Sequence, residues 1–281
     1  GAGADAGALA EGAPPPAGGK RWPLDGDAVV EAPAGRSFET GLVLDVDGDG
    51  ARDLVAWLRA PDALRGELIF APGARPREVR TLAAMPGGLA GAGCVPRAGL
   101  TQISAATLAL EIAPGCPEGV ADPGTRWIAV VQRAPGAAPR LALELRVRVQ
   151  VEEPLELSFE AADRDGDGRE DLAVAFALAE AAADAAPAPR VSAPLWFLDR
   201  PAGLSRDASQ PAAALRTLAE ALLTGAKRDA AGIAARAGAI RRLHRMLCED
   251  AGGTPAVTLA EGPVRCNDPK IEAALARAEA R

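Results

Sequence analysis

The run Asp45-Val46-Asp47-Gly48-Asp49-Gly50-Ala51-Arg52-Asp53-Leu54 recurs in pattern 118 residues later as Asp163-Arg164-Asp165-Gly166-Asp167-Gly168-Arg169-Glu170-Asp171-Leu172. Each copy places four aspartates within nine residues, which costs free energy because like charges repel at short range. A calcium ion reverses that cost, since it takes six to eight oxygen ligands at about 2.3–2.6 Å. An ordinary solvated acidic turn is the alternative reading. The matched spacing of two copies favours calcium.

The expected ligands are the aspartates at the first, third, fifth and ninth positions, with a backbone carbonyl at the seventh. They are Asp45, Asp47, Asp49 and Asp53 with the carbonyl of Ala51, and Asp163, Asp165, Asp167 and Asp171 with the carbonyl of Arg169. An EF-hand would place a glutamate at position twelve, where this chain has Ala56 and Val174. Apolar runs of strand type, 54–58 and 172–176, follow instead. Each ion is therefore expected in a tight loop between two strands.

The two ten-residue runs resemble the calcium loops of FG-GAP and VCBS-type repeats, the family that includes the integrin alpha-chain propeller. Apolar runs at 68–70 and 195–198 add to the resemblance. It implies two calcium ions held for structural reasons within antiparallel β-blades, usually in surface or secreted proteins. Such repeats usually recur at shorter intervals and in larger number. The expected fold is therefore either a set of propeller-like blades, with an intervening blade that lacks a calcium loop, or a sandwich.

Strand patterns fill the rest of the first two thirds of the chain. Apolar residues alternate with polar ones along 141–151, and the same period of two returns in 107–112 and 155–159. This pattern indicates antiparallel strands with one buried and one wet face. The run 127–131 is continuously apolar and is expected to be a central strand. We therefore predict a mainly β protein built of antiparallel sheets.

The spacing of apolar residues becomes helical after about residue 207. Leucines at 215, 218 and 222 and apolar residues at 233, 237, 240 and 247 follow helical spacing. A last helix is expected to start at Asp268-Pro269. The predicted organisation is a flexible Gly/Ala/Pro linker over 1–24, a calcium-binding β-domain over 25–206 and a small helical unit over 207–281. That unit is either a lid packed on the β-domain or a partner-binding surface.

The charge and the apolar runs exclude some classes of function. The formal net charge is −7, which argues against a nucleic-acid partner because such proteins present basic surfaces. No run of 18 or more apolar residues is present, so we predict no transmembrane helix. The sequence also lacks a G-x-S-x-G elbow and a Walker A loop, and nothing singles out a catalytic residue.

The four cysteines indicate disulfides and export. Three connectivities are possible, and we favour Cys94–Cys116 with Cys248–Cys266, because each pair closes a local loop. Four free thiols in a cytosolic protein are the alternative. No C-x-x-C is present, and His244 is the single histidine, so no zinc site is predicted. His244 is expected to be a surface residue on a basic helix face.

These features together predict an exported calcium-binding structural or interaction module without catalytic activity. It would be secreted, periplasmic or at the cell surface, tethered through its N-terminal linker. A surface protein or a glycan is the expected class of partner, and the oligomeric state is left open. The alternatives are a secreted hydrolase that uses carboxylates and a calcium-dependent adhesin.

Overall fold

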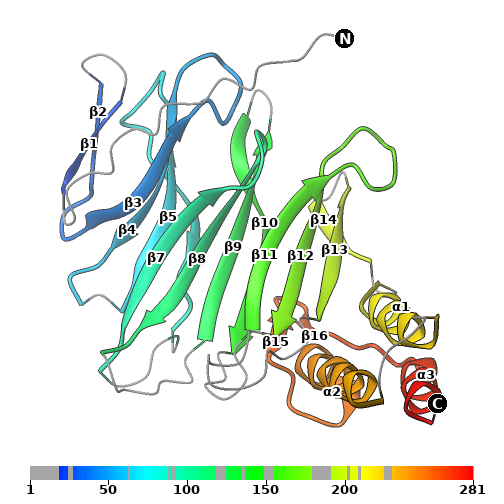
Figure 1. The fold of residues 1–281 in the computed structure, drawn as a ribbon. Helices are drawn as coiled ribbons and strands as arrows, with labels where there is room; N and C mark the ends of the chain where they lie inside the picture. The colour runs from blue at the N-terminus through cyan, green and yellow to red at the C-terminus, as the bar shows by residue number, and fades with distance from the viewer. Residues whose placement is uncertain are drawn as a thin grey trace.

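The computed structural model describes residues 19–24, 28–62, 64–87, 89, 93–117, 125–134, 137–148, 155–178, 191–200, 203–207, 210–224 and 230–280. The protein is mainly β, with three α-helices near the C-terminus (Figure 1). The helices are α1 (Gln210–Thr224), α2 (Ala230–Leu247) and α3 (Lys270–Glu279), with a short 3-10 helix, η1 (Glu249–Ala251).

The strands form four antiparallel sheets, and none of these sheets closes on itself within the described residues. The first sheet is a hairpin of β1 (Arg21–Pro23) and β2 (Val29–Glu31). The second contains β3 (Ser37–Leu44), β4 (Asp53–Arg59), β5 (Gly66–Ala71) and β6 (Arg80–Ala84). The central sheet contains β7 (Val95–Gln102), β8 (Thr107–Gly115), β9 (Thr125–Ala134) and β10 (Ala137–Arg148), extended by β15 (Val257–Leu259) and β16 (Gly262–Pro263). The last contains β11 (Leu155–Ala162), β12 (Asp171–Leu178), β13 (Ser192–Arg200) and β14 (Gly203–Arg206).

Each four-strand run is a meander in which strands adjacent in the chain pair with one another. The runs β3–β6, β7–β10 and β11–β14 follow one another across the molecule (Figure 1). This confirms the prediction of a mainly β protein with antiparallel sheets. Between the two acidic loops in the chain, β7–β10 form a meander without such a loop, and the arrangement as propeller-like blades stays a prediction.

The apolar face of each strand decides which sheets pack together. In β4, Val55 and Trp57 face the central sheet, and Trp57 lies with its ring centroid 6.0 Å from that of Trp127 in β9. The two rings belong to one buried cluster with side chains from β5 and β8. Successive side chains of β4 and β9 point to opposite faces of their sheets, so the side chains between these residues pack against other neighbours.

Side chains on the opposite face of the central sheet are part of the largest buried cluster. Ile128 and Leu145 are fully buried there, in one cluster with Val174 and Phe197 of the last sheet. The same cluster takes in apolar residues of all three helices. The predicted helical unit is thus present, and it shares its core with the β-sheets. Its last helix follows Asp268, whose carboxylate accepts a hydrogen bond from the Lys270 amide at 2.9 Å.

The predicted linker over 1–24 is wrong at its C-terminal end. Arg21–Pro23 forms β1, because Trp22 and Leu24 are buried against the outer face of the β3–β6 sheet. Trp22 meets Phe38 edge to face, with ring centroids 5.5 Å apart. Residues 1–18 of the expected linker, and the alanine-rich run 179–186, lie outside the described residues.

Candidate metal sites

The two acidic loops occupy equivalent places in their sheets. The first joins β3 to β4 and the second joins β11 to β12, so each connects the first and second strands of a meander. This confirms the expected strand–loop–strand placement. Gly48 and Gly50 have φ of 79° and 87°, and Gly166 and Gly168 have φ of 77° and 81°. A side chain is strained at these angles, so glycine permits both loops to turn sharply.

Three of the four predicted aspartates converge in each loop. Carboxylate oxygens of Asp45, Asp47 and Asp53 lie within 4.8 Å of one another, and those of Asp163, Asp165 and Asp171 do the same. The donor set is oxygen alone, which suits a hard cation such as Ca²⁺ or Mg²⁺ and does not suit a soft metal. The residues of both loops therefore fit a hard divalent cation.

The fifth-position aspartates lie outside these two groups of converging oxygens. Asp49 accepts a hydrogen bond from the amide of Ala51 at 2.7 Å, and Asp167 accepts the equivalent bond from the amide of Arg169 at 2.9 Å. Both carboxylates thus turn toward the backbone two residues ahead. The expected roles of the Ala51 and Arg169 carbonyls remain predictions.

Asp53 is the buried anchor of the first loop. One carboxylate oxygen accepts hydrogen bonds from the amides of Val46 at 2.8 Å and Asp47 at 3.2 Å. The other oxygen accepts from the amide of Gly73 at 2.8 Å, just beyond β5. Burial raises the pKa of the Asp53 carboxyl above its ordinary value, while these three backbone donors act in the opposite direction.

Asp171 has the same role in the second loop. It is 1% exposed, and one oxygen accepts from the amide of Arg164 at 3.0 Å. The other accepts from the amide of Asp199, near the end of β13, at 2.8 Å. Each anchor therefore ties its loop to the third strand of the same sheet. Carboxylates retain further lone pairs after such bonds, so an anchor is also able to bind a cation.

The first aspartate of each loop closes the turn around the glycines. Asp45 accepts from the amides of Gly48 at 2.6 Å and Gly50 at 3.3 Å. Asp163 accepts from the amides of Gly166 at 2.8 Å and Gly168 at 3.0 Å. The hydrogen bonds repeat between the loops, so the duplicated sequence produces a duplicated structure.

Arginines distinguish the two loops. Arg200 lies with Nη1 2.8 Å from a carboxylate oxygen of Asp165 and 3.7 Å from one of Asp167, so the second loop already carries a cationic side chain. In the first loop, Arg133 of β9 lies against Gly48, where an added Cβ would stand 2.2 Å from its Nη2. Arg200 is thus placed to compete with a metal ion, a feature that the sequence motif does not reveal.

The second loop is also tied to the central sheet. Glu170 accepts hydrogen bonds from the hydroxyls of Ser104 and Thr107, which flank the β7–β8 turn, the latter at 3.1 Å. Asp199 pairs with Arg140 of β10 at 2.7 Å. Through these contacts the second loop helps to hold the central and last sheets together.

Both predicted disulfides are present. Cys94 is joined to Cys116, and Cys248 is joined to Cys266, which links the end of α2 to the segment before α3. All four cysteines are paired, as predicted.

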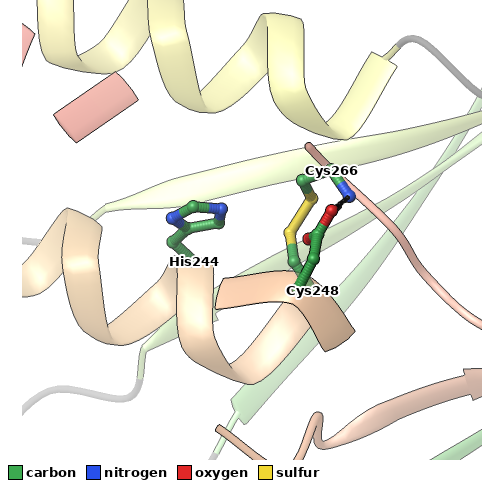
Figure 2. Close-up of side chains that lie close together, drawn as sticks. His244, Cys248 and Cys266 are labelled. Atoms are coloured by element: carbon green, nitrogen blue, oxygen red, sulfur yellow. Dashed lines mark hydrogen bonds between the residues drawn. A yellow bond between two sulfur atoms is a disulfide. The ribbon is translucent and has the colours of Figure 1, made fainter. Parts of the chain in front are cut away.

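A third group of potential ligands surrounds the second disulfide. His244, Cys248, Asp250 and Cys266 each offer a ligand atom, and these atoms all lie within 4.8 Å of one another. Figure 2 shows the imidazole of His244 beside the disulfide. The predicted surface position of His244 is wrong: the residue is half-buried, and burial lowers its pKa. Its spacing from Cys248, four residues later at the end of a predicted helix, was the signal available in the sequence.

Comparison with known proteins gives no family for this chain. No protein-family model, no curated protein and no solved structure matches it. Of the helices in the described ranges, none combines the length and the apolar character that crossing a membrane requires.

Proposed function

We propose that this protein is an exported calcium-binding module, in which two ions order the β3–β4 and β11–β12 loops. The sheets then serve a structural or interaction role, without catalysis. The observation that carries the proposal is the convergence of three carboxylates within 4.8 Å in both loops, at equivalent places of two sheets. Calcium would offset the mutual repulsion of these carboxylates and stabilise the folded loops.

The disulfide-bonded cysteines support the proposal that the protein is exported. Two disulfides suit an oxidising compartment such as a periplasm, a cell surface or the extracellular space. Calcium is also abundant enough outside the cell to fill weak sites, whose Kd values are about 10⁻⁴–10⁻³ M in extracellular modules. The proposed partner class is a surface protein or a glycan, bound by the ordered module.

Calorimetric titration of the chelator-stripped protein with Ca²⁺ tests the proposal. Two sites are expected in the wild-type protein, and one site in each of the variants Asp47→Asn and Asp165→Asn. These substitutions keep the side-chain volume and remove the charge. A calcium concentration about ten times the Kd would stabilise the fold by about 1.4 kcal/mol for each filled site.

Asp62→Asn is the matched control, because Asp62 is exposed outside both loops and pairs with Arg65 at 2.8 Å. This variant is expected to keep both calcium sites. Absence of binding at millimolar calcium would leave the loops as acidic turns and refute the proposal. The adhesin alternative predicts partner binding that is lost in chelator. The hydrolase alternative predicts turnover that persists in chelator.

A further inference from the structure

The cluster around the second disulfide contains the donor types that zinc prefers. His244 lies in the last turn of α2, and Cys248 follows directly after the helix, where its amide donates to the His244 carbonyl at 2.9 Å; Asp250 lies in η1. Cys266 approaches from the segment before α3 (Figure 2). Structural zinc sites are almost always tetrahedral and use sulfur, imidazole nitrogen and carboxylate oxygen. This cluster offers two sulfurs, one nitrogen and one carboxylate, whereas the acidic loops offer oxygen alone.

The spacing of the four donors is close to what a tetrahedral ion requires. Zinc bonds of about 2.0–2.3 Å place neighbouring ligand atoms about 3.3–3.8 Å apart. All four donors already lie within 4.8 Å of one another. In the oxidised protein the two sulfurs are bonded to each other, so a site forms only when that bond opens and the sulfurs move apart by less than about 2 Å.

The surrounding fold is suited to keep the donors together after the bond opens. Cys248 is fully buried and Cys266 is 7% exposed. Asp250 accepts hydrogen bonds from the amides of Cys266, at 2.9 Å, and Asn267. The amide of Glu249 donates to the carbonyl of Val264 at 2.7 Å. These bonds join the two segments independently of the sulfur bridge, so reduction leaves the thiols facing one another.

We propose that reduction of the Cys248–Cys266 disulfide converts this cluster into a zinc site formed by His244, Cys248, Cys266 and Asp250. A dithiol reductant would supply two electrons and two protons to the sulfur–sulfur bond and would itself become a disulfide. Zinc then replaces the two thiol protons, which pass to solvent, and bonds both thiolates. Disulfide and zinc are therefore mutually exclusive ways of joining α2 to the segment before α3.

The other disulfide provides an internal control. No group of metal ligands within the described residues includes Cys94 or Cys116. Among the described residues, reduction of that pair creates two thiols that form no such group with an imidazole or a carboxylate. The proposal therefore predicts that, after reduction, zinc binds at Cys248 and Cys266 and does not bind at the other cysteine pair. It is independent of calcium binding by the acidic loops.

The test uses the full chain, reduced with a phosphine and titrated with Co²⁺ as a spectroscopic substitute for zinc. One equivalent is expected to give thiolate-to-cobalt charge-transfer absorption and the intense visible bands of a tetrahedral site, and zinc should abolish both. The charge-transfer band reports thiolate ligation alone, so metal bound at the aspartates does not interfere. The oxidised protein should show no such band.

Variants make the assignment specific. The double variant Cys94→Ser/Cys116→Ser should keep the signal, and Cys248→Ser/Cys266→Ser should lose it. His244→Gln should weaken zinc binding at least about tenfold while leaving the oxidised protein folded, as circular dichroism would show. Any one of three results would overturn the proposal: no cobalt signal in the reduced protein, a signal that survives in Cys248→Ser/Cys266→Ser, or unchanged affinity in His244→Gln.

Discussion

Replacing Asp53 by alanine separates the two roles of the first loop, anchoring and metal binding. The carboxylate accepts hydrogen bonds from three backbone amides, of Val46, Asp47 and Gly73. Hydrogen bonds to a charged group contribute about 1.5–3 kcal/mol each. Two of the three are only partly buried, so water can replace the carboxylate there, and removing a buried charge recovers some free energy. The expected net loss of stability is about 3–5 kcal/mol.

This loss should be present in chelator, because it arises from hydrogen bonds of the protein itself. Asp47→Ala is the matched comparison, since Asp47 accepts one exposed hydrogen bond, from the Asp49 amide at 3.1 Å. In chelator that variant should lose at most about 1 kcal/mol. In calcium it should lose the stabilisation from the ion as well. The two aspartates are thus expected to respond differently to calcium.

The assay is urea denaturation in chelator and in calcium, followed by tryptophan fluorescence. Three of the four tryptophans, Trp22, Trp57 and Trp127, are buried against the β3–β6 sheet or in the core that it shares with the central sheet, so their emission reports unfolding of this part of the protein. The m-value tells whether the variants unfold the same surface as the wild type. An Asp53→Ala protein within about 0.5 kcal/mol of wild type in chelator would refute the anchoring role.

Two further substitutions test features that the acidic motif alone does not contain. Arg200→Gln should strengthen calcium binding at the second loop by up to about fivefold, because an exposed ion pair worth about 0–1 kcal/mol no longer has to be broken. Titration in an Asp47→Asn background isolates that loop, and a weaker site would contradict the competition. Gly66→Ala should destabilise the protein by about 1–3 kcal/mol, since the new Cβ would lie 2.1 Å from Cζ2 of Trp57. Gly99→Ala, in β7 with open space around its Cβ, should differ from wild type by less than about 0.5 kcal/mol when both are measured by urea denaturation, and equal effects would contradict the packing argument.

The elements of this fold were predictable where the pattern is local. Alternation along β10 and helical spacing along α2 each depend on neighbouring residues: β10 includes residues 141–148 of the predicted run 141–151, whose last three lie outside the described residues, and α2 includes the apolar residues of the predicted helix. The disulfides were also predictable, because each closes a short loop. The hairpin at Arg21–Pro23 was not predicted, since its strands are three residues long and depend on Trp22 reaching the β3–β6 sheet.

The candidate sites were likewise predictable where they depend on residues close in sequence, and not where they depend on distant ones. The carboxylates that converge in each loop are close in sequence, so the motif identifies them. The partners of the anchors come from the end of the third strand, at Gly73 and Asp199, which are 20 and 28 residues away. The group around His244 requires Cys266, which follows a further pair of strands. Contacts of this kind depend on how the chain folds back, and no local pattern records them.

The central sheet differs from its two neighbours in the connection between its first two strands. It has the same meander as its neighbours, but Ile103–Ala106, where the flanking sheets have an acidic loop, forms a short turn. The hydroxyls of Ser104 and Thr107 bind Glu170 of the adjoining sheet instead. The four-strand meander of the central sheet therefore forms without an acidic loop of its own. The contact between the central and last sheets, in turn, has two parts: the apolar faces that share one core, and the hydrogen bonds from the loopless turn to Glu170.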